Sequence, residues 1–77
     1  MQNIIELAEQ VSPRLAQDLE EVLHQQQRVM TMGLEEVTQT QGVEREDAVA
    51  ALRRRVQVAQ EDVDDVLRRL QREVASD

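Results

Sequence analysis

The chain has 77 residues, a net charge of −7 at pH 7, and neither cysteine nor aromatic residues. That length supports one small domain, the missing cysteines exclude disulfide and thiol chemistry, and the acidic balance argues against general affinity for nucleic acid or anionic lipid. No run of apolar residues approaches the roughly 18 that span a bilayer, and the N-terminal residues lack the basic region of a secretory signal, so we expect an acidic cytoplasmic protein without a transmembrane segment.

Residues 2–11 are predicted to form a short amphipathic helix, with Ile4 and Ala8 on one stripe. The pair Ser12-Pro13 follows. Serine is a favourable N-cap, and proline is tolerated at the first helical position, so a second helix is predicted to begin at Pro13. The alternative is one helix kinked at this proline, which removes a backbone donor.

The second helix is predicted over residues 13–40. Its apolar stripe drifts and is interrupted by the glutamines at 25–27. Gly33 costs about 1 kcal/mol relative to alanine in a helix interior. Met30 and Met32 have adaptable thioether side chains that suit a binding surface, although filling gaps in a core near the turn is their ordinary role.

A turn is predicted at residues 38–42, because Gly42 suits a helix C-cap with positive φ. The acidic residues that follow suit the first turn of a helix, where the macrodipole favours negative charge. A third helix is therefore predicted over residues 43–75. The two long helices are expected to fold back on each other as a hairpin; the alternative is one nearly continuous helix with Gly42 as a weak point.

The third helix carries an unbroken 3-4 repeat of apolar residues, which is the period of a coiled-coil seam. A short chain without aromatic residues, disulfides or zinc ligands has little from which to build a core, and association remedies this. We therefore expect one all-α domain over residues 1–77, a short helix plus a helical hairpin, that associates as a coiled coil or helix bundle. The predicted oligomer interface consists of Val49, Leu52, Val56, Ala59, Val63, Val66 and Leu70.

Charges in the third helix come in alternating acidic and basic blocks. A second copy packed antiparallel about residues 57–58 sets blocks of opposite sign side by side and also aligns the apolar seam. In that register Arg55 of one chain lies beside Asp62 of the other. The second helix of the same chain offers a poorer charge match, so we predict a homo-oligomer, with the antiparallel dimer favoured.

No catalytic, metal, cofactor or nucleotide motif stands out, and we expect no enzyme. Glu21 and His24 have the E-x-x-H spacing of di-iron bundles, but both point well over 90° away from the predicted apolar stripe at 100° per residue. The arginines at 53–55 fan around the helix and lie between acidic blocks, which indicates ion pairing on a solvated surface.

The segment Val43-Glu-Arg-Glu-Asp47, followed by heptads, resembles the coiled-coil ends of small bacterial phasin-like and ubiquinone-accessory proteins. The resemblance covers residues 43–47 only, and Glu44 stands where those proteins have a serine or threonine cap. It implies an oligomerising helix that opens after a turn, and a role at a lipid or granule surface.

We therefore expect a non-enzymatic helical interaction protein: a homo-oligomerising adaptor, regulator or assembly subunit that acts through its coiled-coil seam and has a protein partner of its own. The alternative is an amphipathic protein that coats an apolar lipid or granule surface. The two differ in whether the apolar stripes are already covered in the oligomer. A liposome or oil-interface binding assay separates them.

Overall fold

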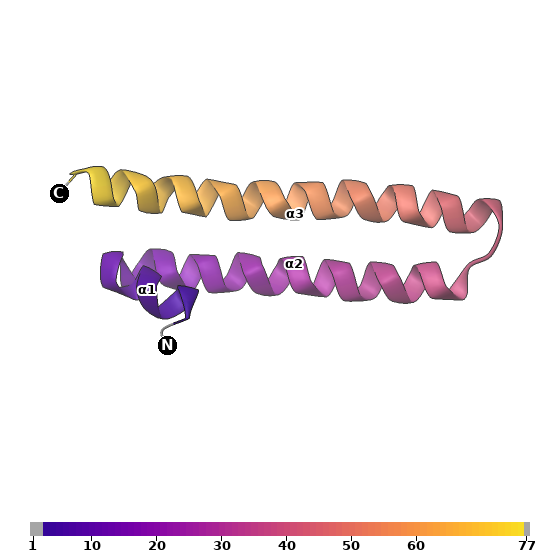
Figure 1. Cartoon of the computed structure of the whole chain (residues 1–77), viewed down its shortest axis with the longest axis horizontal. Coiled ribbons are helices and arrows are strands. Elements are labelled where there is room, and N and C mark those ends of the chain that lie inside the picture. The colour runs from indigo at the N-terminus through magenta and orange to yellow at the C-terminus, as the bar shows by residue number, and fades with distance from the viewer. Residues whose placement is uncertain (1–2, 77) are drawn as a thin grey trace.

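The computed structural model describes residues 3–76, and its regular structure consists of three helices. They are α1 (Ile4–Val11), α2 (Pro13–Gln39) and α3 (Val43–Ser76). α2 and α3 lie antiparallel along the long axis, and α1 lies across the N-terminal part of α2 (Figure 1). The predicted all-α hairpin is confirmed, because α2 turns back on α3. The predicted start of the first helix at residue 2 lies outside the described residues.

Ser12 separates α1 from α2. Its backbone is extended, and its Oγ accepts a hydrogen bond of 3.3 Å from the backbone N–H of Leu15. Pro13 occupies the first position of α2, where a missing N–H costs nothing. At the other end of α1, Asn3 Oδ1 accepts a bond of 2.9 Å from the N–H of Glu6. The predicted capping at Ser12-Pro13 is therefore confirmed, and the chain has two helices here rather than one kinked helix.

The turn between α2 and α3 depends on Gly42. Its φ is +65°, in the left-handed region that glycine adopts without steric cost. The C=O of Gly42 accepts the N–H of Glu46, which starts the ladder of α3. Arg45 Nε donates to the C=O of Val37 at 3.3 Å and ties the end of α2 to the start of α3. The predicted positive φ at Gly42 is confirmed, but its predicted role as a helix C-cap is wrong: the C-cap of α2 is Thr40, and Gly42 directly precedes α3.

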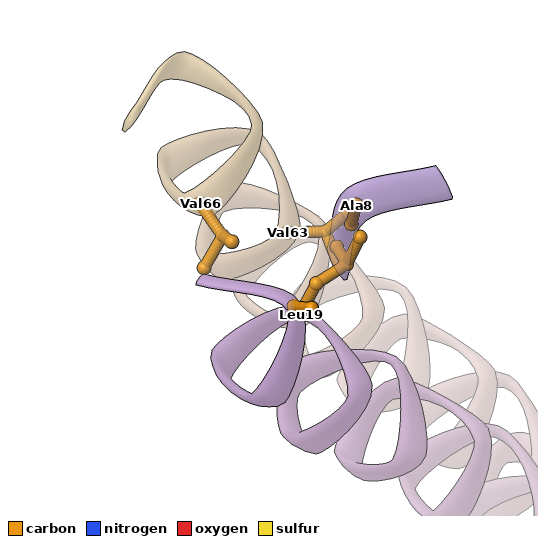
Figure 2. Close-up of a cluster of buried hydrophobic side chains, with 5 residues drawn as sticks. Ala8, Leu19, Val63 and Val66 are labelled. Atoms are coloured by element: carbon orange, nitrogen blue, oxygen red, sulfur yellow. The ribbon is translucent and has the colours of Figure 1, made fainter. Parts of the chain in front are cut away.

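The core lies where the three helices meet, at the end of the hairpin far from the turn. Figure 2 shows Ala8, Leu19 and Val63 converging there. Leu19 is 1% exposed and is the largest fully buried side chain. The core cluster consists of Ala8, Ala16, Leu19, Val63 and Val66, with Ile5, Val22, Leu23 and Leu70 packed against it. This is a small core made of aliphatic side chains, as expected for a chain without aromatic residues.

Towards the turn, α2 and α3 approach closely at Gly33 and Leu52, which are both buried. A Cβ at position 33 would overlap the Leu52 side chain. Gly33 therefore allows the close approach, which compensates for its low helix propensity. Only the cost of Gly33 is predictable from the sequence, because its contact partner Leu52 is 19 positions away and no local pattern points to it.

Candidate interaction surface

The predicted seam of α3 faces the other helices of the same chain. Leu52, Ala59, Val63 and Val66 are buried, and Val56 and Leu70 are half-buried. Only Val49 of this set is exposed, at 41%. The heptad pattern thus identified the buried side of α3, and α2 and α1 cover that side.

That these residues form an interface between two chains stays a prediction. The fold limits which of them a second chain could contact. Residues buried in the hairpin reach a second chain only if the helices separate. Two folded hairpins meet instead through exposed side chains, with Val49 at the edge of the seam among them.

Exposed apolar side chains gather on the side of the hairpin that carries α1, which we call the α1 face. Residues seven apart share one side of a helix, so Met30 continues the stripe of Leu23, which packs against the core cluster near Ala8. By the same rule Val49 shares the side of Val56 on α3. Helical spacing assigns to this face five exposed residues of the hairpin, and the exposed residues of α1 itself join them. The set is Met30, Leu34, Val49, Leu67 and Val74 with Ile4, Leu7 and Val11.

α1 covers only half of this face. α1 lies over the N-terminal part of α2, and the half of the hairpin nearer the turn has no third helix on it (Figure 1). We call this second part the bare half. A shallow depression runs from it to the middle of the hairpin and is lined by Met30, Leu52, Arg53, Val56, Gln57, Gln60, Glu61 and Asp64.

Polar side chains mark the middle of the hairpin. Gln26 Nε2 donates to Gln60 Oε1 at 2.7 Å, which links α2 to α3. Gln60 Nε2 in turn donates to Asp64 Oδ1 at 3.1 Å. This line of amides and a carboxylate lies between the half that α1 covers and the bare half.

The predicted interface charges, Arg55 and Asp62, lie on the opposite side of the hairpin. There they line a second shallow depression with Val29 and Val58. Arg55 forms an ion pair of 3.8 Å with Glu36 of α2, and both side chains are exposed. The structure thus places Arg55 and Asp62 on one surface and gives Arg55 a partner within the chain, Glu36, which was not predicted from the sequence.

The methionines are more exposed than predicted. Met30 is 44% exposed and Met32 63%, so their interpretation as gap-filling core near the turn is wrong. α2 and α3 are held together at this level by Gly33 and Leu52, which leave no gap for a long side chain to fill. Met30 instead forms part of the bare half.

The side chains considered as metal ligands or as a basic patch lie at the surface. Glu21 and His24 are both exposed, as their position on the helical wheel predicted. Within residues 3–76, no three His, Cys, Asp or Glu side chains lie close enough together to hold a metal ion. The arginines at 53–55 are all exposed. The candidate surface of this molecule is therefore the α1 face, which combines exposed apolar side chains with charges of both signs.

None of the described helices combines the length and the apolar character needed to cross a bilayer. Compared with protein-family models, curated proteins and solved structures, the chain shows no match. The short resemblance at residues 43–47 therefore has no support from the rest of the chain. Function has to be argued from the surface itself.

Proposed function

We propose that this chain is a non-enzymatic helical interaction protein that pairs with a second copy of itself as an antiparallel dimer, and serves in that form as an adaptor, regulator or assembly subunit. The observation that carries the proposal is the α1 face, where eight large apolar side chains are exposed on one side of the hairpin. Monomeric soluble proteins rarely leave contiguous apolar patches of more than a few hundred Å² in water, and larger ones mark interaction sites.

The dimensions of the chain suit such an interface. Its two longer dimensions are 53 and 23 Å, and a standard interface buries about 800 Å² on each partner. One face of the hairpin has room for that area. The monomer gains little from its own core, in which Leu19 is the largest fully buried side chain, so covering the α1 face adds a large fraction to the total apolar burial.

Charge supports the antiparallel direction. On the α1 face, Arg53 and Asp64 lie at the rim of the same depression. An antiparallel second copy centred between them sets Arg53 of each chain near Asp64 of the other. The pair Arg55 and Asp62 would meet in the same way if the opposite side of the hairpin formed the contact. A single two-fold dimer uses one side only, and more of the exposed large apolar residues are assigned to the α1 face than to the opposite side.

Sedimentation velocity tests the proposal. The wild-type protein is expected to shift from monomer to dimer with concentration, and its melting temperature to rise with concentration, because dimer stability depends on protomer concentration. Leu34→Glu changes a side chain on the α1 face that is 51% exposed, and the matched control Val58→Glu changes one on the opposite side that is 58% exposed. We expect the first to abolish the dimer and the second to leave it. A protein that stays monomeric at high micromolar concentration contradicts the proposal.

The second candidate function is a coat on an apolar lipid or granule surface. The same α1 face favours it, since Ile4, Leu7 and Val11 form an exposed apolar stripe along a short helix. Flotation with uncharged phosphatidylcholine vesicles or oil droplets separates the candidates. Binding that Leu34→Glu abolishes, in a protein that sediments as a monomer, supports the coat over the dimer.

A further inference from the structure

We infer that the bare half of the α1 face is a seat for α1 of the second copy, so that each α1 packs on its own hairpin and on the partner's at once. This inference rests on the proposed dimer and adds which segment binds where. It follows from a repeat in the seam, from the shape of the face and from its charges.

The bare half repeats the pattern of the half that α1 covers. Residues 14 apart lie on nearly the same side of a helix, since an ideal helix drifts only about 20° per heptad. Two heptads beyond Ala16, Leu19 and Leu23 on α2 lie Met30, Gly33 and Val37. Two heptads before Val63, Val66 and Leu70 on α3 lie Val49, Leu52 and Val56. The apolar strip on which α1 packs therefore continues along the hairpin towards the turn, where α1 does not cover it.

The exposed side of α1 fits this strip. α1 buries Ala8 in the core and leaves Ile4, Leu7 and Val11 exposed along an adjacent stripe. These three residues have the spacing with which amphipathic helices occupy apolar grooves. α1 thus presents one apolar side to its own hairpin and a second, adjacent one that is about half exposed.

The shape of the face is self-complementary under a two-fold axis. α1 lies over one half of the face, and none of the described helices lies over the bare half (Figure 1), which carries a shallow depression at Met30 and Val56. An axis that lies in the face near Gln26 and Gln60, across the long direction, places α1 of each copy over the bare half of the other. Such an isologous contact closes as a dimer and leaves neither seat empty.

The same axis is consistent with the charges. It brings Arg53 of one copy opposite Asp64 of the other, twice, with glutamine side chains between them. A parallel arrangement would set Arg53 near Arg53 and Asp64 near Asp64. Opposite charges at the rim of an apolar contact favour the antiparallel register and disfavour the parallel one.

Chemical cross-linking tests the seat directly, because the chain contains no cysteine. Leu7→Cys and Leu34→Cys are made as separate variants, mixed, and treated with a short flexible bis-maleimide. Each variant has a single thiol, so every 7–34 product joins two chains. We expect the 7–34 product to dominate over 7–7 and 34–34 products, and Val58→Cys to cross-link poorly with Leu7→Cys.

A second measurement does not depend on a cross-linker. Leu7→Gln is expected to weaken the dimer about ten-fold or more with unchanged far-UV circular dichroism, since Leu7 is exposed in the monomer. If the protein dimerises but 7–34 products are no more frequent than 7–58 products, the seat is wrong and the proposed dimer stands. If the protein is monomeric by sedimentation at the concentration used, both the seat and the dimer are wrong.

Discussion

The two halves of the hairpin have apolar residues at the same heptad positions, but some equivalent positions differ in burial. Where α1 covers the hairpin, Ala16 is 1% exposed, whereas Met30, two heptads further along, is 44% exposed. Leu19 and its counterpart Gly33 are both buried, so the difference is confined to the edge of the seam. The apolar pattern is similar in both halves, so pattern alone does not decide whether a position becomes core or surface. α1 covers one half, and the other half leaves Met30 exposed.

The largest expected effect comes from the covered half. Leu19→Ala removes the largest fully buried side chain and should lower the free energy of unfolding by roughly 3 kcal/mol, the cost of a core cavity. Leu34→Ala in the bare half should change it by less than about 1 kcal/mol in the monomer, because that side chain is half exposed. Urea unfolding at low protein concentration measures both. Equal losses would show that the two halves are equally packed.

The next comparison sets the two sides of α3 against each other. Val56→Asp places a carboxylate at a half-buried position and should destabilise by about 1–3 kcal/mol. Val58→Asp should change stability by about 0.5 kcal/mol or less, because Val58 is exposed and lies about 200° around the helix from Val56. Thermal melts followed by circular dichroism compare the two. A similar loss in both variants would mean that the wrong side of α3 is assigned to the hairpin.

Gly33 tests the close approach within the bare half. Gly33→Ala gains about 1 kcal/mol of helix propensity, but the new Cβ overlaps Leu52, and overpacking of this kind costs about 1–3 kcal/mol. We expect a net loss of about 1 kcal/mol in denaturant unfolding. Leu52→Ala is itself destabilising because Leu52 is buried, but the double variant should lose less than the sum of the two single variants, because the overlap is gone. A Gly33→Ala variant that is more stable than wild type would contradict the tight contact.

The smallest expected effect separates the two sides as dimer contacts. Arg53→Glu should weaken the dimer by about 1–2 kcal/mol in total, since an exposed pair contributes about 0.2–1 kcal/mol and the two-fold axis repeats it. Adding Asp64→Arg should restore most of the loss. Arg55→Glu with Asp62→Arg is the matched pair on the opposite side and should show no such rescue. Dimer dissociation constants at low salt, where screening is weak, decide which pair makes the contact.

Local features of the fold were predictable because each has a local cause. The capping by Ser12, the proline at position 13 and the positive φ at Gly42 depend on neighbours within a few residues. The buried side of α3 was predictable from its 3-4 spacing, since that spacing sets which side chains share a side of a helix.

Which helix covers the buried side of α3 was not predictable from this spacing. An apolar seam is satisfied equally by a helix of the same chain or of another, and only the folded hairpin shows that α2 and α1 cover Leu52, Ala59, Val63 and Val66. The ion pair between Arg55 and Glu36 and the role of Gly33 were missed for a related reason. Each depends on a partner about 19 residues away, which has no counterpart in a local pattern.

The hydrogen bond between Gln26 and Gln60 has a consequence for alignment. A heptad seam places apolar residues at equivalent positions every seven residues. Two such helices could therefore slide past each other by one heptad with little change in apolar contact. A slide of one heptad would place Gln60 level with Leu19 in one direction and with Gly33 in the other, and the amide would lose its partner. Single polar positions in otherwise apolar seams specify register in this way. Together with the tight fit of Leu52 against Gly33, this pair distinguishes the observed register from its near-equivalents.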